Sequence, residues 1–338
     1  MKGRGGAITL LSLGALFVAA ALVVQFWFLP RKAVFPDDVD AIRTYEGTLV
    51  TMMNADALAI GDVENLFLEN IPVKISRHVT TEDASGGKAL VLEVAKVSDA
   101  RTNMPVPGID PTEDWYTIDR KSMEHIANFT DNANVDENRQ GLVIGFPIGT
   151  KTETYQGWSD DLQKLMDLEF VATEDRAGMS LYHFRSQSDL QPVLGGANLE
   201  VFPQDLPKDT VLQLAPLIAP PEVVAGLAEF APLLPDPVAF GYIYGYETNY
   251  WVDPATGVLV DYSKTEQYYL TVLGQEVAKV FDLNYVHTAE SIADAKKDAE
   301  DNGLFLNLFG TIIPWSALGL GALLLLGGGF LLMRKKES

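Results

Sequence analysis

The four histidines are the residues in this sequence that are best suited to bind a metal. His78, His125, His183 and His287 are scattered along the chain. None of them forms an H-x-H or H-E-x-x-H pair, the spacings that place two imidazoles on one metal ion. The chain has no cysteine, which excludes thiolate-bound zinc and disulfide bonds. The sequence therefore predicts no metal site and no cofactor.

Catalytic motifs are also absent from the sequence. It contains no P-loop, no dinucleotide fingerprint and no G-x-S-x-G elbow. The segment 131–138, DNANVDEN, is rich in oxygen ligands, but it lacks the EF-hand glycine and has Val143 where the closing glutamate belongs. We expect a solvated loop there, no catalytic residue and no enzymatic activity. A glycan hydrolase is one alternative, and it would require two carboxyl groups roughly 5–10 Å apart in a cleft.

Aromatic side chains form the candidate binding surface. Phe240, Tyr242, Tyr244 and Tyr246 alternate along one expected strand and therefore share one face of it. This stripe is either part of the core or the wall of an apolar ligand groove. The preceding segment, 192–237, is rich in Pro, Leu, Ala and Val. Such an apolar stretch outside a membrane must bury itself, contact a partner or line a ligand cavity.

Most of the chain has the pattern of β-strands. Short runs rich in β-branched and aromatic residues alternate with Gly- and Pro-containing turns. The pattern predicts a mainly β (α+β) fold, with an antiparallel β-barrel or sandwich-like extracytoplasmic domain.

A weak internal repeat is also present. The segments VTTEDASG (79–86) and VATEDRAG (171–178) agree at five of eight positions, and each lies between two strand-like runs. They suggest two related β units, 35–125 and 146–270. The alternative is that the same favourable turn sequence occurs twice.

Two uncharged apolar segments, 5–30 and 311–333, flank the β region. Each is long enough to cross a hydrocarbon core of about 30 Å as a helix. Signal peptides have shorter apolar regions that end in a small-residue cleavage site. We therefore expect two transmembrane helices, the first of them an uncleaved anchor. A helix at 288–303, capped by Gly303, should precede the second span.

The distribution of charge predicts the topology. The tails 1–4 and 334–338 are basic, so the positive-inside rule places both termini in the cytoplasm. We expect a two-pass plasma-membrane protein with residues 31–310 on the extracytoplasmic side. The whole chain carries a formal net charge of −21, which excludes nucleic acid as a partner. The expected partners are the lipid bilayer and either a lipid ligand or an envelope protein.

Three motifs resemble the actinobacterial porin PorA-like family: FPIGTKTETYQGWSD (146–160), YTIDRKS (116–122) and YWVDPATGVLVDY (250–262). The resemblance spans nearly the whole chain and offers no catalytic residues. It implies an envelope protein and, by the family's label, a porin. A transmembrane β-barrel, however, crosses the bilayer with alternating strands of about 9–11 residues and without apolar helical spans.

The plan of two anchors around one β domain is also similar to that of CD36-type receptors, whose ectodomain contains a lipid tunnel. This is an analogy of topology. We expect a non-enzymatic, membrane-anchored envelope protein whose ectodomain binds or transfers an apolar envelope molecule, a lipid. The alternatives are an envelope scaffold and a porin-like channel component.

Overall fold

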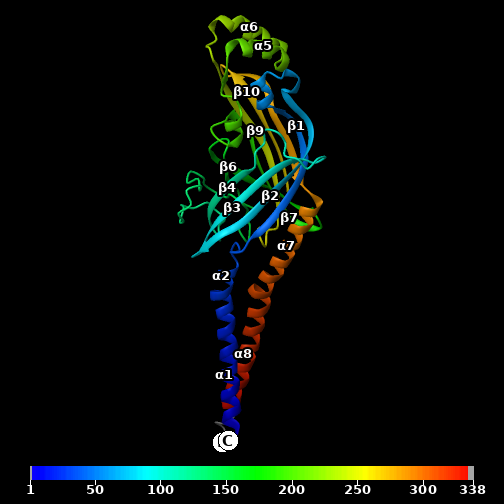
Figure 1. The fold of residues 1–338 in the computed structure, drawn as a ribbon. Coiled ribbons are helices and arrows are strands. Elements are labelled where there is room, and N and C mark those ends of the chain that lie inside the picture. The colour runs from blue at the N-terminus through cyan, green and yellow to red at the C-terminus, as the bar shows by residue number, and fades with distance from the viewer. Residues whose placement is uncertain (1, 334–338) are drawn as a thin grey trace. The chain divides into compact units, whose positions relative to one another are not determined.

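The computed structural model describes residues 2–333, which form two compact units (Figure 1). The β unit spans Asp37–Lys296, and the helical unit contains the described residues up to Pro36 and from Lys297 onward. The predicted C-terminal tail 334–338 and Met1 lie outside the described residues.

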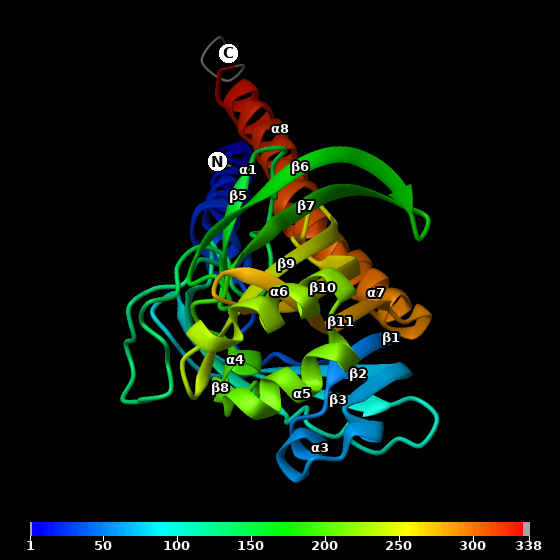
Figure 2. The same ribbon diagram turned by 90° about the horizontal axis from the view of Figure 1, so that it is seen from above.

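One antiparallel sheet of eleven strands forms the β unit and confirms the predicted mainly β fold. The strand order is β4-β3-β2-β1-β11-β10-β9-β7-β6-β5, and β8 pairs with β9. Figure 2 shows this sheet curving into a half-barrel. The strands are β1 Asp40–Met53, β2 Phe67–Ser85, β3 Lys88–Asp99, β4 Thr112–Asp119, β5 Tyr155–Ser159, β6 Lys164–Arg176, β7 Met179–Pro192, β8 Asp205–Leu206, β9 Val238–Val252, β10 Leu259–Val272 and β11 Gln275–His287.

The first and the last strand of the β unit in chain order lie side by side in the sheet. Strand β1 pairs with β11, with Tyr45 opposite His287 and Met52 opposite Phe281. The pairing joins the beginning and the end of the β unit in the middle of the sheet. Each inward aromatic ring buries about 150–250 Å², and Tyr45 and Tyr268 are both fully buried. Apolar burial of this kind stabilises a β unit that has no disulfide bond.

Two sets of four strands flank the central strands β11 and β10, one set on each side, and in both sets each strand pairs with the next. The strands β1, β2, β3 and β4 pair in succession, as do β5, β6, β7 and β9. The matching segments 79–86 and 171–178 both lead into two-residue hairpin turns, Gly86-Gly87 and Ala177-Gly178. All four turn residues have positive φ, as a type I′ turn requires. The internal repeat itself stays a prediction.

The apolar insertion folds as short helices at one end of the strands (Figure 1). Its buried side chains belong to the main core cluster; examples are Val211, Leu227 and Leu234. Pro220 precedes one of its helices and Pro221 begins it, whereas Pro216 lies inside another helix, which the sequence predicts it to break. The helical elements of the β unit outside α7 are α3 Ala55–Ile60, η2 Val63–Asn65, α4 Ala197–Val201, α5 Lys208–Ile218, α6 Pro221–Phe230 and η3 Ala231–Leu233.

The remaining helices include two that are long and apolar enough to cross a membrane, Gly5–Lys32 and Ala289–Met333. The first contains most of α1 (Lys2–Val23), the π-helical turn η1 (Val24–Phe28) and α2 (Leu29–Lys32). The second contains α7 (Ala289–Asn307), the π-helical turn η4 (Leu308–Ile312) and α8 (Ile313–Met333).

The predicted end of a helix at Gly303 is wrong, because helical backbone continues through this residue to Asn307. A glycine inside a helix costs only about 1 kcal/mol relative to alanine. Packing beyond it offsets this cost, since the ring of Phe28 lies 6.4 Å from that of Phe305 and 5.2 Å from that of Phe309.

Helices α1 and α8 pack closely through glycines. A Cβ atom on Gly14 would lie 2.8 Å from the carbonyl oxygen of Gly321, and one on Gly321 would lie 2.8 Å from a methyl carbon of Val18. Small residues permit such close approach of two membrane helices.

Replacing Gly321 by leucine should separate these helices, because overpacking a close contact costs about 1–3 kcal/mol. The chain has no native cysteine, so the double variant Leu11→Cys/Gly328→Cys reports on the contact. A Cβ on Gly328 would lie 2.8 Å from Leu11 Cγ, which brings the two Cβ atoms within disulfide range. We expect Gly321→Leu to reduce the yield of this cross-link several-fold.

Gly319→Leu is the matched control, because a Cβ there meets nothing within 4 Å. It should leave the yield unchanged. Equal yields for the two leucine variants would contradict the close packing.

Candidate functional site

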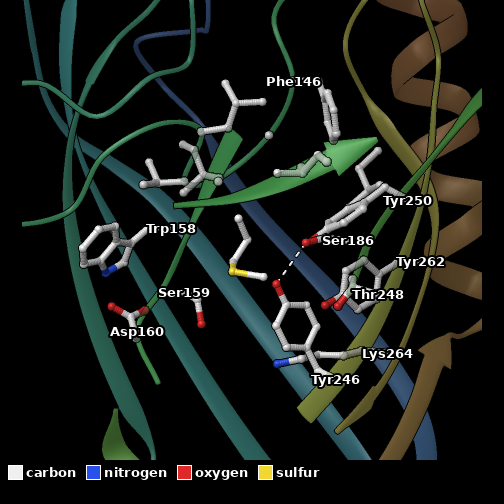
Figure 3. A pocket seen from close by; sticks show the side chains of 18 of the residues that line it. Phe146, Trp158, Ser159, Asp160, Ser186, Tyr246, Thr248, Tyr250, Tyr262 and Lys264 are labelled. Carbon is white, nitrogen blue, oxygen red and sulfur yellow. Dashed lines mark hydrogen bonds between the residues drawn. The ribbon is translucent and has the colours of Figure 1, made fainter. Parts of the chain in front are cut away.

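A cavity of about 240 Å³ lies within the β unit (Figure 3). This volume corresponds to roughly eight water molecules at about 30 Å³ each. Its walls come from β2, β5, β6, β7, β9 and β10 and from the loop before β5. Aromatic side chains contribute much of the surface: Phe146, Trp158, Tyr244, Tyr246, Tyr250 and Tyr262.

The register of three strands places a polar row beside an aromatic row. Ser186 on β7 is opposite Thr248 on β9, which is opposite Lys264 on β10. All three line the cavity. Tyr250 and Tyr262 form the next inward pair on β9 and β10. Successive inward positions on one strand lie about 7 Å apart, so both rows border the same small space.

The polar row contains a largely buried ion pair. Lys264 Nζ lies 2.7 Å from Glu266 Oε2, and the two side chains are 21% and 11% exposed. Tyr244 donates a hydrogen bond of 3.0 Å to the same oxygen. Burial alone would lower the pKa of Lys264, but Glu266 and neighbouring tyrosines outweigh burial and raise that pKa well above its usual value. Lys264 is therefore a cation in the cavity wall.

The hydroxyl groups of the wall are close enough to interact. Ser186 Oγ and the Tyr246 hydroxyl lie 3.0 Å apart, so one donates to the other. Figure 3 shows this pair facing the cavity near Lys264. The hydroxyl that donates in this bond keeps acceptor capacity alone, whereas the hydroxyl that accepts keeps its O–H donor for a ligand.

A second polar centre in the wall is Asp161. Burial raises the pKa of its carboxyl group to about 6, although Lys264 and a hydrogen bond from the Tyr268 hydroxyl oppose the shift. The neighbouring Asp160 also has a raised pKa because of burial, opposed by Arg139. These are the two carboxylates among the described residues that line the cavity. The glycan-hydrolase alternative stays an untested prediction.

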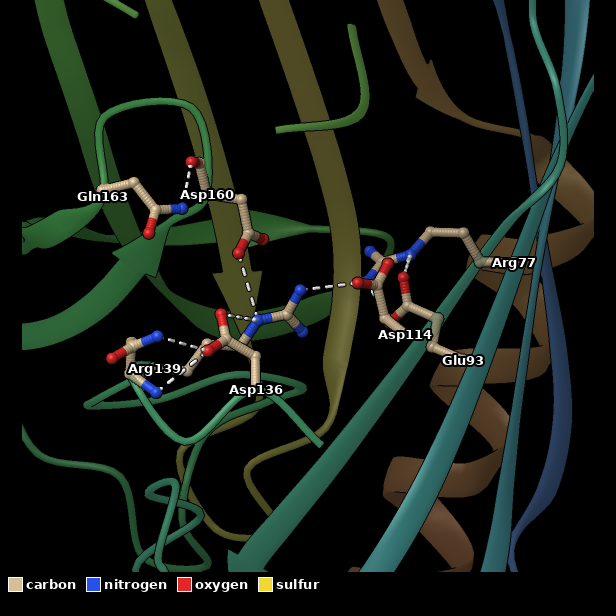
Figure 4. A network of polar contacts seen from close by, with 8 residues as sticks. Arg77, Glu93, Asp114, Asp136, Arg139, Asp160 and Gln163 are labelled. Atoms are coloured by element: carbon tan, nitrogen blue, oxygen red, sulfur yellow. Dashed lines mark hydrogen bonds and ion pairs between the residues drawn. The ribbon is translucent and has the colours of Figure 1, made fainter. Parts of the chain in front are cut away.

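Arginine side chains hold the polar network around the cavity (Figure 4). Arg77 contacts Glu93 through two hydrogen bonds of 2.8 and 2.6 Å. Arg139 is 8% exposed and donates to Asp114 at 2.6 Å and to Asp160 at 3.0 Å. Its guanidinium carbon lies 4.7 Å from the ring centre of Tyr116. Two-point pairing and stacking fix such side chains in place.

The four residues predicted to form the wall of a ligand groove lie in three different environments. Tyr244 and Tyr246 line the cavity, whereas Tyr242 is a buried core residue packed on Phe202 with ring centres 5.1 Å apart. Phe240 lines a separate apolar pocket of about 30 Å³ beneath α5 and α6. The insertion thus contributes to this small pocket and to the core. Whether the four residues contact a ligand stays a prediction.

Sequence reasoning missed the polar part of the wall. The alternation that singled out Tyr244 and Tyr246 continues inward through Thr248 and Tyr250, which was the available signal. Lys264, Ser186 and the aspartates lie far away in the chain, and only strand register brings them to the cavity.

Two of the histidines have well-defined surroundings in the structure. His287 is buried beside Tyr45, with ring centres 4.6 Å apart, and burial lowers its pKa to about 4. His183 donates or accepts hydrogen bonds with Glu174 at 2.9 Å and Asn249 at 2.8 Å. Within residues 2–333, no group of three His, Asp or Glu side chains is arranged to hold a metal ion.

The chain matches a protein family and a curated protein over nearly its whole length. Residues 6–330 match the sequence profile of the family described as Porin PorA. A protein named Porin PorA from Corynebacterium resistens is 22% identical, over 97% of this chain and 96% of that protein.

Solved structures give weaker similarities. RV0216, a conserved hypothetical protein from Mycobacterium tuberculosis with a double hotdog fold, aligns with a TM-score of 0.15 and 10% identity over 80% of each chain. A MaoC-like dehydratase aligns with a TM-score of 0.13 and 10% identity over 82% of this chain and 83% of that one. These scores are too low to support an argument about the fold.

The Lys264–Glu266 pair yields a test of stability. Lys264→Met should destabilise the β unit by about 3 kcal/mol, because it leaves Glu266 buried without its cation. The double variant Lys264→Met/Glu266→Gln should recover most of this loss. Thermal unfolding of the full chain in nanodiscs, followed by circular dichroism, measures both. A single variant as stable as the parent would contradict the buried pair.

Asp161 yields a test of pH dependence. Its folded-state pKa of about 6 lies above its usual value, so the folded protein retains a proton between about pH 4 and 6 that the unfolded chain has lost. The extra proton of the folded state stabilises it relative to the unfolded chain. This stabilisation is fully present below pH 4 and is lost as the pH rises through 6. Asp161→Asn should therefore gain stability relative to the parent from pH 4 to 7, by about 3 kcal/mol at most.

Unfolding curves of the parent and of Asp161→Asn across this pH range measure the difference. Comparing the two proteins cancels the contributions of all other carboxylates. A difference in stability that is independent of pH would contradict the raised pKa.

Proposed function

The chain belongs to the Porin PorA family, and on that premise we propose that it is a non-enzymatic, membrane-anchored envelope protein whose β unit binds the polar head of an amphipathic envelope molecule. The observation that carries the proposal is the cavity with aromatic and charged walls. Two helices long and apolar enough to cross a membrane support the anchoring.

The composition of the wall supports a binding role. Lys264, Glu266 and Asp161 lie in the interior, where apolar residues of similar volume are often equally or more stabilising. Charged groups that gather in a cavity, with a carboxyl pKa raised by burial as in Asp161, are typical of functional sites. A sheet selected for stability alone would fill this space with apolar side chains.

The polar lining of the cavity and the small size of the apolar pocket favour recognition of a head group over enclosure of an acyl chain. The apolar pocket beneath α5 and α6 has about 30 Å³, the volume of roughly one water molecule. The cavity beside Lys264 has polar groups that an acyl chain would leave without hydrogen-bond partners. A further pocket, of about 430 Å³, is lined in part by Lys74, Ser76 and Lys96. On this proposal the lipid's tail stays outside the cavity.

The proposed topology has two passes, with both termini in the cytoplasm and the β unit outside it. Basic residues in both tails support this orientation. The bilayer is the first partner. An envelope protein that docks on the β unit, which would make the chain a scaffold, is the alternative partner.

A porin-like channel component is the second candidate, and the family's name favours it. The close glycine contacts between α1 and α8 fill the space between these two helices. A pore built from them would therefore need several copies of the chain, with its walls formed between copies.

Native mass spectrometry of the full chain in nanodiscs, incubated with an envelope lipid extract, tests the binding role. The parent should retain a bound molecule, and Lys264→Met/Glu266→Gln should lose it. Lys151→Met is the matched control, because Lys151 is exposed and lines none of the pockets of about 240, 30 and 430 Å³. It should bind as the parent does.

Planar-bilayer recordings of the same preparations separate the two candidates. Binding without conductance supports the binding role. Single-channel steps from a protein that retains no molecule would favour the channel and overturn the binding role.

A further inference from the structure

We propose that the head bound in the cavity is a neutral, polyhydroxylated ring, a single sugar residue. This inference rests on the proposed function and adds the chemical class of the ligand. Three features of the cavity support it: the aromatic row beside the polar row, the charge balance of the wall and the volume.

The two rows match the two surfaces of a sugar ring. The aromatic row, Tyr250 and Tyr262, offers apolar ring surface to the C–H groups of a sugar. The adjacent row, Ser186, Thr248 and Lys264, offers hydroxyl and ammonium groups. A sugar presents C–H groups and hydroxyl groups within the same few ångströms, and the rows lie about 7 Å apart along the strands.

The hydrogen-bonding groups of the wall suit hydroxyl ligands, which both donate and accept. The Ser186 and Tyr246 hydroxyls, 3.0 Å apart, share one hydrogen bond, so together they offer one free O–H donor and free acceptor sites. Lys264 uses one bond on Glu266 and has further N–H donors. Asp161 supplies an acceptor. A ligand with donors alone or acceptors alone would leave part of this set unsatisfied.

The charge balance argues against an anionic head. The two cations that line the cavity are already paired, Arg77 with Glu93 at 2.6 Å and Lys264 with Glu266 at 2.7 Å. Asp160 and Asp161 add further negative charge to the same wall. A phosphate or carboxylate would therefore meet no excess of positive charge, and its desolvation would lack compensation.

The volume sets the size of the ligand. Pockets for drug-sized molecules usually have about 300–1,000 Å³, and this cavity has about 240 Å³. One ring fits better than a chain of several.

Intrinsic tryptophan fluorescence of the full chain in nanodiscs tests the inference, because Trp158 lines the cavity. The probes are the methyl glycosides of glucose, mannose, galactose and arabinose, with inorganic phosphate and octanoate as the charged and acyl comparisons. We expect a saturable change with at least one glycoside and none with phosphate or octanoate. Trp158→Phe should lose the change in fluorescence.

The variant Ser186→Ala/Thr248→Val removes two hydroxyls from the polar row with little change of volume. It should weaken glycoside binding about tenfold or more. Ser85→Ala, which removes a hydroxyl from an exposed β2 residue that lines none of the described pockets, is the matched control. Thermal unfolding verifies that each variant is folded.

The outcomes separate this inference from the proposed function. Saturable binding of phosphate or octanoate without any glycoside would overturn the sugar assignment and leave the binding role intact. Glycoside binding that is unchanged in Ser186→Ala/Thr248→Val would overturn the cavity as the sugar site. Failure of all probes and of the lipid extract would overturn both proposals.

Discussion

The register of β9 with its two neighbours is the constraint on which the interior of the β unit depends. Strand side chains alternate strictly between two faces, so one strand's position decides which of its residues face inward. Between β7 and β10, β9 turns tyrosines toward the core and Thr248 toward Lys264. A shift by one residue would place the outward face of β9, including Glu247 and Asn249, in the core. The same alignment therefore gives the sheet its core and the cavity its polar wall.

The interior balances aromatic packing against buried charge. Tyr45, Tyr244 and Tyr268 are almost fully buried, and such rings contribute large apolar areas. The ion pairs of Arg77 and Lys264 interrupt that packing. Buried pairs of this type contribute little net stability. A single apolar cluster stabilises the unit well enough for the sheet to tolerate them, without any covalent cross-link.

Local features of the fold could be predicted from the sequence, whereas features that depend on distant pairing could not. The two hairpin turns were predictable because Gly86, Gly87 and Gly178 adopt positive φ at low cost, although Ala177 also does so without that freedom. The stripe on β9 follows from period-two alternation. The helix through Gly303 was not predictable from its own residues, because Phe305 and Phe309 extend it by packing on Phe28. Lys264 and Asp161 become neighbours of β9 only through long-range strand pairing and loop placement. Two of the family motifs contain wall residues, among them Phe146, Trp158 and Tyr262, but a motif alone does not show that these side chains share one cavity.

The pairing of β1 with β11 has a consequence for how the protein is made. Residues near Tyr45 find their partners near His287, almost at the end of the β unit. Contacts so distant in sequence slow folding, because the entropy of closing the long loop is lost before the contact forms. During synthesis, β1 has one unpaired edge until the last strand emerges, and exposed edges invite aggregation. The sheet can therefore close around β1 only after nearly the whole β unit has been made.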